Sequence, residues 1–307
     1  MVKSNLKEQK VIKKADLKVV DNNAVKTTAY SDINLKKWRE YDHIKTDTLW
    51  EFPNRLKEGG HSNEYHGNYI PQIAQQIYER YTKKNDIVLD LFFGSGTSGI
   101  EAINMGRRCI GVELKDELAE SVSEKFTPKQ LVTDVNIICA DSASEIAKEK
   151  IKARLDIMGA KKAQLLMLHP PYDDIIKFSD KKEDLSNCAT TEEFYDLFEK
   201  VAKNGYDLLE KGRFACLIIG DKYANSQHIP LGFECMARMN KLGFITKAII
   251  IKDMQGNERA KGKTANLWRY RALAGTSPSR TAKSTATPMW EARTATSSSC
   301  SIPEAEG

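Results

Sequence analysis

The chain has 307 residues, of which 41% are hydrophobic and 29% charged, and a formal net charge of +5. This length and composition indicate a soluble globular protein with one large or two small domains and a sizeable core. No apolar run approaches the length of a membrane span, and the Lys-rich start is not a secretory signal, so we expect a cytoplasmic protein without a membrane partner.

Composition divides the chain into three parts. Residues 1–37 begin with a Lys-rich stretch, and we expect a basic arm that is solvated more readily than bound to DNA. Residues 38–274 are expected to form the one folded domain. Residues 275–307 are dominated by Ser, Thr and Ala, which predicts a disordered tail. This tail looks foreign to the preceding sequence, as after a reading-frame change or a fusion, and a native low-complexity tail is the alternative.

Strand and helix patterns alternate along the central part. The expected strands, in chain order, are 86–90, 108–113, 135–140, 163–168, 213–220 and 244–252. The expected helices are 70–81, 97–105, 116–126, 143–155, 192–209 and 230–242. This alternation predicts an α/β fold with a mostly parallel, doubly wound sheet. The nearly continuous apolar strands agree, because strands of such a sheet are buried on both faces.

A Gly-rich turn follows the first strand of this alternation. Its pattern, Gly94-x-Gly96-x-x-Gly99, has the form of a dinucleotide fingerprint. Glycines there let the backbone approach a ligand closely, and Thr97 opens the helix that follows. Leu91, Phe92 and Phe93 make the turn bulkier than a loop that lies against a pyrophosphate, which argues against a nicotinamide enzyme.

Carboxylates end the first three strands. Asp90 precedes the turn, where it can meet the cationic amino group of a methionine moiety, and Glu113 can accept hydrogen bonds from ribose hydroxyls. Asp141 is placed to contact an adenine amino group. A plain tight turn would explain the glycines but not these three acids, so we expect a cofactor site at the carboxyl edge of the sheet.

His169-Pro170-Pro171-Tyr172 follows the fourth strand. An exocyclic amino nitrogen is a poor nucleophile because its lone pair is delocalised into the base. The side chain at 169 and the carbonyl of Pro170, stiffened by the two prolines, could accept its two hydrogens and free the lone pair. Tyr172 could stack on a base turned out of the helix. No Pro-Cys nucleophile motif or Cys-x-x-Cys metal motif is present, so we expect neither a covalent intermediate nor a metal.

At these residues the chain resembles the amino-group DNA methyltransferases that modify adenine-N6 or cytosine-N4. The resemblance runs from about Trp50 to about Leu273 and includes the segments 65–72 and 88–97. It implies a class I, Rossmann-like methyltransferase fold, S-adenosylmethionine as cofactor, and double-stranded DNA with a flipped base as substrate, as in restriction-modification. It also implies a set of cofactor-binding residues, namely His66, Asn68, Asp90, Phe92, Gly94, Gly96, Thr97, Glu113 and Asp141.

The chain departs from this family at two places. His169 stands where the family usually has Asp, Asn or Ser, which removes the clue to adenine or cytosine. Since only neutral histidine accepts a hydrogen bond, we expect activity to fall as the pH drops through the ordinary histidine range. Residues after Leu273 offer no apolar strand, so we expect the sheet to lack its last strand.

Two other functions remain open from sequence. An RNA base methyltransferase of the guanine-N2 or adenine type shares the Pro-Pro-Tyr logic, so RNA is an alternative partner. A catalytically silent nucleic-acid-binding homologue would keep the fold. The sequence contains no separate recognition domain and does not indicate an oligomeric state.

Overall fold

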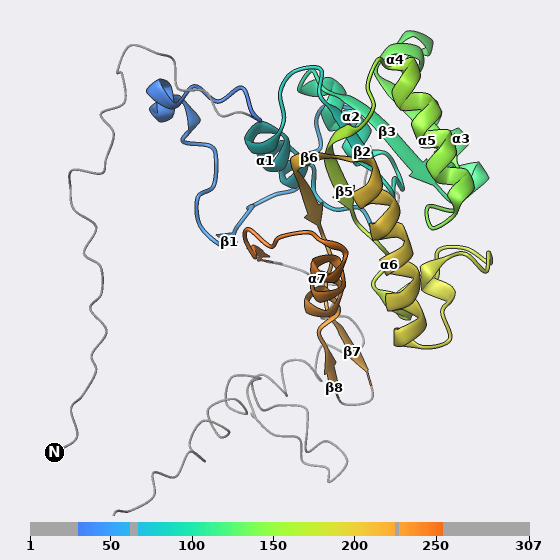
Figure 1. Cartoon of the computed structure of the whole chain (residues 1–307). Helices are drawn as coiled ribbons and strands as arrows, with labels where there is room; N and C mark the ends of the chain where they lie inside the picture. Colours follow the sequence, from blue (N-terminus) through green and yellow to red (C-terminus); the bar gives the residue numbers. More distant parts are fainter. Residues whose placement is uncertain (1–29, 62–66, 225–226, 254–307) are drawn as a thin grey trace, which may run out of the picture.

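The structure, a computed structural model, describes residues 30–61, 67–224 and 227–253. Its centre is a five-stranded sheet in the order β4-β3-β2-β5-β6, with every neighbouring pair parallel. Relative to their order in the chain, these strands follow the 3-2-1-4-5 pattern of a Rossmann-like, doubly wound sheet. The predicted α/β fold is confirmed (Figure 1).

The strands and helices fall close to the predicted positions. The strands are β1 Leu49–Trp50, β2 Ile87–Asp90, β3 Arg108–Glu113, β4 Val135–Cys139, β5 Ala163–Leu168, β6 Leu209–Leu217, β7 Lys222–Ala224, β8 Gln227–Ile229 and β9 Ile251–Lys252. The α-helices are α1 Pro71–Tyr81, α2 Thr97–Asn104, α3 Asp116–Ser123, α4 Pro128–Thr133, α5 Glu145–Ile157, α6 Thr191–Leu208 and α7 Leu231–Leu242. Short 3₁₀ helices are η2 Leu35–Tyr41, η3 Asp173–Ile175 and η4 Leu185–Asn187.

Two apolar clusters cover the two faces of the sheet, because successive side chains of a strand point to opposite sides. Val88 of β2 packs with residues of α1, α2 and α3, whereas its neighbours Ile87 and Leu89 pack with residues of α5, α6 and α7. All four residues of β2 are buried. The central strands are therefore held from both sides, which fixes the carboxyl edge of the sheet as a rigid platform.

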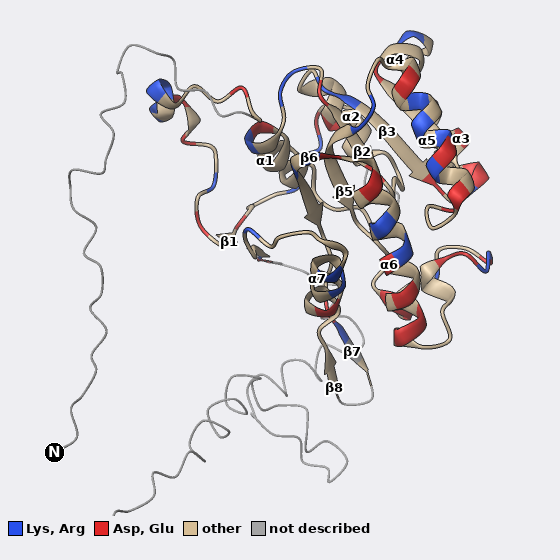
Figure 2. Ribbon diagram, in the orientation of Figure 1, with Lys and Arg blue, Asp and Glu red and all other residues tan. Residues whose placement is uncertain are grey.

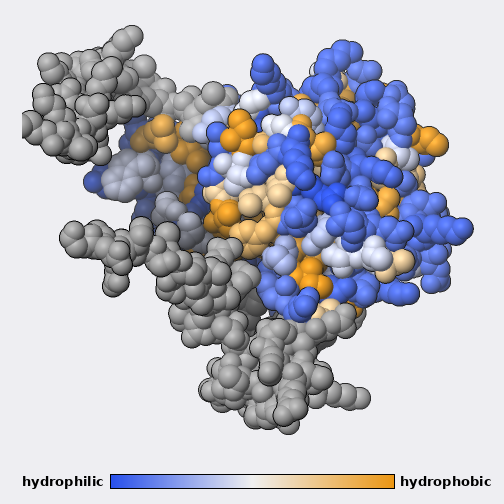
Figure 3. Space-filling model, turned by 60° about the horizontal axis from the view of Figure 1, so that its bottom comes forward, coloured by the Kyte–Doolittle hydropathy of each residue, from blue (hydrophilic) through white to orange (hydrophobic). Residues whose placement is uncertain are grey.

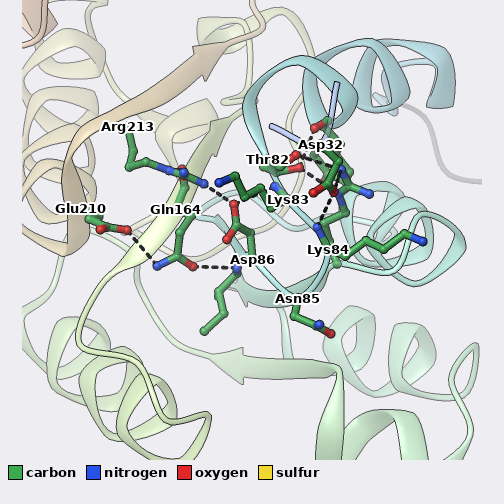
Figure 4. Close-up of polar contacts among 12 residues, drawn as sticks. Asp32, Thr82, Lys83, Lys84, Asn85, Asp86, Gln164, Glu210 and Arg213 are labelled. Atoms are coloured by element: carbon green, nitrogen blue, oxygen red, sulfur yellow. Dashed lines mark hydrogen bonds and ion pairs between the residues drawn. The ribbon is translucent and has the colours of Figure 1, made fainter. Parts of the chain in front are cut away.

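Polar contacts lock the opposite, amino-terminal edge of the sheet (Figure 4). Arg213 of β6 forms an ion pair with Asp86, which directly precedes β2. Between them, Gln164 of β5 accepts a hydrogen bond from the backbone N–H of Ile87 at 2.9 Å and donates one to Glu210 at 3.2 Å. These contacts set the register of β2, β5 and β6 far from the carboxylates that the sequence singled out.

Lys, Arg, Asp and Glu residues are frequent along α3, α5 and α6 (Figure 2). The surface in Figure 3 is mostly hydrophilic, with separate apolar patches. Ile245 and Ile251 are 75% and 57% exposed. None of the helices in the described ranges is long and apolar enough to cross a membrane.

The predicted sixth strand is wrong in place and length. Only Ile251–Lys252 of residues 244–252 form a strand, β9, and it pairs in parallel with β1 rather than joining the main sheet. A strand needs backbone partners as well as apolar alternation. Within the described ranges β6 ends the sheet. Residues after Leu273 lie outside these ranges, so the expected lack of the last strand stays a prediction.

Helix α4 and the hairpin β7–β8 are among the elements that were not predicted. Helix α4 begins at a capping box in which Thr127 and Gln130 satisfy each other's backbone N–H, followed by a proline at the first helical position. The antiparallel hairpin β7–β8 follows β6. The capping box was visible in the sequence, but the hairpin strands are three residues each, too short to show alternation.

The domain boundaries stay predictions, because most of residues 1–37 and all of 275–307 lie outside the described residues. At the end of the first part, Asp32 accepts a hydrogen bond from the backbone N–H of Lys84 at 2.7 Å and pairs with Arg107. The Tyr30 ring packs edge-on against Phe214, with centroids 4.8 Å apart. Residues 30–32 are thus attached to the folded domain.

Candidate functional site

The candidate site lies where the strand order reverses. Strands β2 and β5 are neighbours, and Asp90 is in register with Met167, two residues before His169. The helix after β2 covers one face of the sheet and the helix after β5 the other. In open parallel sheets this switch point, at the carboxyl ends of the strands, is the usual place for a ligand. The two sequence motifs therefore lie beside each other at this edge of the sheet.

The turn after β2 needs its glycines for two different reasons. Gly94 and Gly96 adopt left-handed φ values of +51° and +83°, which side chains rarely tolerate. Gly99 and Gly111 instead make room for the Phe93 ring, since a Cβ atom would come within 2.8 Å and 2.2 Å of it. Phe93 is 3% exposed, so this bulky turn is anchored by an aromatic side chain beneath it.

Asp90 is a buried carboxylate held by two donors. Its Oδ1 accepts from the backbone N–H of Phe92 at 2.9 Å, and its Oδ2 accepts from the hydroxyl of Ser98. Burial raises the pKa of Asp90 to about 6, against the opposing effect of these hydrogen bonds. No described cation forms an ion pair with it. A ligand that brings a positive charge to this carboxylate would offset the free-energy cost of its burial.

Glu113 and Asp141 follow Asp90 along the same edge. Glu113 accepts from the backbone N–H groups of Gly94 and Lys115, each at 2.9 Å, so it also shapes the turn. Burial raises its pKa. Asp141 accepts from the backbone N–H of Ala143 at 2.8 Å at the start of the α5 turn. Carboxylate oxygens accept more than one hydrogen bond, so both acids keep capacity for hydroxyl or amino groups.

The remaining predicted cofactor residues surround the turn. Asn68 accepts a hydrogen bond from the hydroxyl of Ser95 at 2.5 Å and so joins the 67–70 segment to the turn. Thr97 is the first residue of α2 and is buried. Phe92 contributes its backbone N–H to Asp90 while its side chain packs on the core. His66 lies outside the described residues.

His169 and Tyr172 contact each other after β5. Nε2 of His169 lies 3.2 Å from the Tyr172 hydroxyl, and Pro170 between them is buried. Burial lowers the pKa of His169 to about 4 and raises that of Tyr172 to about 12. The histidine is therefore neutral at ordinary pH, which moves the expected loss of activity from the ordinary histidine range to about pH 4. The earlier pH expectation is corrected, because it ignored burial.

A buried network holds this motif in place. Asp173 directly follows Tyr172, is 1% exposed and adopts a left-handed φ of +54°. Its carboxylate accepts from the hydroxyl of Thr191 at 2.6 Å and from the ammonium of Lys222 at 2.8 Å. The loop after β5 is thus tied both to the start of α6 and to β7.

Three further residues contact the two motifs and were missed by sequence reasoning. Tyr69 lies between the two motifs, with its ring perpendicular to that of His169 and the centroids 5.2 Å apart. Its hydroxyl lies 2.6 Å from Oγ of Ser98. Gly220, after β6, lies against the Tyr172 ring. Tyr69 falls inside the segment 65–72, so that segment was the available signal, while Ser98 and Gly220 had none.

The acceptor groups of the site fit a ligand with a cation at one end and hydroxyl and amino groups at the other. The acids at the ends of β2, β3 and β4 supply acceptors in that order, and Gly94 and Gly96 open the backbone between them. Within the described ranges, no group of His, Cys, Asp and Glu residues could hold a metal ion. S-adenosylmethionine has the required groups, so the residues present are compatible with it.

Comparisons with known proteins agree with this geometry. Residues 3–124 match the family model described as DNA methylase. The chain is 34% identical over 100 residues to a probable type III restriction-modification enzyme HindVI Mod subunit of Haemophilus influenzae, covering 31% of this chain and 13% of that protein. It is 32% identical over 112 residues to the DNA adenine methyltransferase YhdJ of Escherichia coli, covering 36% and 35%.

The two relatives are matched over only part of their length. The chain thus spans well under half the length of either relative. The crystal structure of a TehB-like SAM-dependent methyltransferase from Corynebacterium glutamicum superposes with a TM-score of 0.39 and 15% identity, over 62% of this chain and 84% of that one.

Proposed function

We propose that this chain, whose residues 3–124 match the DNA methylase family model, transfers a methyl group from S-adenosylmethionine to an exocyclic amino nitrogen of a DNA base. The target is N6 of adenine or N4 of cytosine in a nucleotide flipped out of the duplex. The observation that carries the proposal is the meeting of Asp90 and the His169–Tyr172 motif at the switch point between β2 and β5. The Asp90 carboxylate suits a cationic cofactor, and the His169–Tyr172 motif suits a neutral amino group.

The three carboxylates at the ends of β2, β3 and β4 would bind S-adenosylmethionine. Asp90 would attract the cationic amino group of the methionine moiety, and Glu113 and Asp141 would accept from the ribose and the adenine. When bound, S-adenosylmethionine supplies an electrophilic methyl group on a sulfonium centre. The residues of the turn orient it, since Gly94 and Gly96 permit close approach of the backbone.

The His169–Tyr172 motif would bind the target base and make its amino nitrogen a better nucleophile. His169 has one donor and one acceptor nitrogen when neutral. If Nε2 carries the hydrogen and donates to the Tyr172 hydroxyl, Nδ1 is the acceptor for one amino hydrogen of the base, and the carbonyl of Pro170 accepts the other. Two such hydrogen bonds favour a tetrahedral amino nitrogen with a free lone pair. The aromatic face of Tyr172 would stack on the flipped base.

The test is transfer of labelled methyl groups from S-adenosylmethionine to duplex DNA and, separately, to RNA, followed by mass analysis of the nucleosides. We expect N6-methyladenine or N4-methylcytosine from DNA and no label in RNA. Replacing Tyr172 by Ala should abolish transfer while leaving the Kd for S-adenosylmethionine within about threefold, because the ring contacts the base and not the cofactor.

Each other outcome counts against the proposal in a defined way. Label in RNA alone would favour an RNA base methyltransferase. Intact cofactor binding with no label in either nucleic acid would favour a silent homologue. Equal loss of cofactor binding and transfer in Tyr172→Ala would contradict the role given to that side chain.

A further inference from the structure

Tyr69 connects Asp90 to His169 through a short series of side-chain contacts. Its hydroxyl lies 2.6 Å from Oγ of Ser98, and the Ser98 hydroxyl in turn donates to Oδ2 of Asp90. A serine hydroxyl has one hydrogen, and that hydrogen is engaged by the carboxylate. Tyr69 must therefore be the donor to Ser98. The chain of donors runs from Tyr69 through Ser98 and ends on the charge of Asp90.

The other side of Tyr69 meets the base motif. Its ring is perpendicular to that of His169, with centroids 5.2 Å apart, which is a favourable arrangement for two aromatic rings. His169 contacts Tyr172 through the 3.2 Å pair described above. Tyr69 is only 8% exposed. A change in its orientation would therefore move the His169 ring, since close-packed side chains transmit small displacements.

The residues around the Tyr69 side chain, Ser98 and Asn68, are held in place. Ser98 is fully buried in α2, and its carbonyl accepts from the hydroxyl of Tyr78 at 3.0 Å. Asn68, next to Tyr69, is held by Ser95 of the turn and by Arg55, which donates to the Asn68 carbonyl at 3.1 Å. With both ends anchored, the hydroxyl and ring of Tyr69 are the parts that can respond to a change at Asp90.

We propose that Tyr69 is a positioning residue that couples cofactor binding at Asp90 to the orientation of His169 for the base. This inference rests on the proposed function. A cation bound to Asp90 neutralises part of the carboxylate charge that polarises the Ser98 hydroxyl, and hydrogen bonds in a chain polarise one another where the surroundings exclude water. The bond from Tyr69 to Ser98 then weakens, and the Tyr69 ring against His169 shifts with it.

The consequence is a thermodynamic coupling between the two ligands. The cofactor should raise the affinity for duplex DNA, and DNA should raise the affinity for the cofactor by the same factor. Couplings of this kind are on the order of 5- to 150-fold. The unreactive product S-adenosylhomocysteine serves as the probe, because it carries the same amino group to Asp90 and allows binding to be measured without turnover.

The chain offers a matched pair of variants. Tyr69→Phe keeps the ring and removes the hydroxyl that binds the Ser98 side chain. Tyr78→Phe removes an equally buried hydroxyl that binds the carbonyl of the same serine but does not contact His169. Both variants lose one buried hydrogen bond, so a comparable fall in melting temperature is expected from each.

The experiment measures the Kd for duplex DNA with and without saturating S-adenosylhomocysteine in the full chain and in both variants. We expect the ratio of the two Kd values to fall to about 1 in Tyr69→Phe and to keep its wild-type value in Tyr78→Phe. The Kd for S-adenosylhomocysteine alone should change less than about threefold in both. Ser98→Ala, which interrupts the same chain of donors, should also bring the ratio to about 1.

The outcomes separate this inference from the proposed function. A wild-type chain that methylates DNA, with a Tyr69→Phe variant that keeps the full ratio, overturns the coupling and leaves the function intact. An equal loss in Tyr69→Phe and Tyr78→Phe also overturns it, because general packing would then explain both. A wild-type chain that puts no label into DNA overturns the proposed function and the coupling with it.

Discussion

Gly220 and Tyr172 are in direct contact: a Cβ atom added at Gly220 would lie 2.8 Å from Cε2 of the Tyr172 ring. The two residues follow different strands, β6 and β5, which are neighbours in the sheet. The absence of a side chain at position 220 therefore sets where the ring can lie. It follows that the ring that we propose to stack on the base depends on a residue 48 positions later in the chain.

Replacing Gly220 by Ala should displace the Tyr172 ring and lower kcat/KM for DNA by on the order of 10²-fold, the effect of a misplacement of about 1 Å at a reacting centre. The Kd for S-adenosylmethionine should not change. Gly232→Ala is the control, because its Cβ atom would meet only Ile219 and Asp221, at 3.2 Å and 3.6 Å. A Gly220→Ala enzyme as active as this control would show that the ring moves without effect.

The affinity for S-adenosylmethionine should depend on pH through Asp90. Its pKa of about 6 means that the carboxyl is charged above this pH and neutral below it. Since the charged form attracts the cationic amino group, binding should weaken as the pH falls through about 6 in the free enzyme. Calorimetric titrations at a series of pH values give the midpoint.

Asp90→Asn should remove this pH dependence and weaken cofactor binding by about tenfold or more, as expected for the loss of a charged hydrogen bond. The variant keeps the size of the side chain and an acceptor for Ser98. The same midpoint in Asp90→Asn would assign the titration to another group, such as Glu113, whose pKa burial also raises.

His169 should remain a hydrogen-bond acceptor down to a lower pH than an ordinary histidine. Burial holds its pKa at about 4, so the ring loses its acceptor nitrogen only as the pH falls through about 4. Between about pH 5.5 and 8, which spans the ordinary histidine range, the transfer rate should therefore be flat at saturating cofactor, since saturation offsets weaker binding to protonated Asp90. Single-turnover rates across this range test the prediction.

Replacing His169 by Ala should reduce the transfer rate by about 10²-fold, the size of contribution that one positioned group makes to such a step. His169→Asn restores an acceptor of the type common in the resembling family and should recover part of this loss. Equal rates for the Ala and Asn variants would contradict the role of position 169 as a hydrogen-bond acceptor.

Asp173 should contribute to stability through its buried contacts. Asp173→Ala leaves the Lys222 ammonium, which is 12% exposed, without this carboxylate and places Ala at a left-handed φ of +54°. We expect unfolding in urea to require about 2–3 kcal/mol less free energy. Asp173→Asn should lose less, because Asn tolerates this conformation and keeps an acceptor for Thr191. Equal losses would attribute the effect to charge alone.

Much of the fold was predictable because its causes are local. The runs 108–113 and 163–168 became β3 and β5 without a change of boundary, since continuous apolar stretches between turn residues leave few other arrangements. The segment 244–252 failed for the opposite reason. Its apolar pattern is strand-like, but pairing depends on what lies beside it, and only Ile251–Lys252 found a partner, in β1.

The candidate site, too, was predictable only in part from the sequence. Asp90, Glu113 and the His169–Tyr172 motif could be named from the sequence because each ends an apolar run, and the ends of parallel strands meet at one edge. The proposed chemistry, a carboxylate for a cation beside acceptors for an amino group, therefore follows from the sequence itself. The tertiary structure decided how these groups behave, because burial and contact are properties of the packed chain: it set the pKa of His169 near 4 and that of Asp90 near 6, placed Gly220 against Tyr172, and inserted Tyr69 between the two motifs.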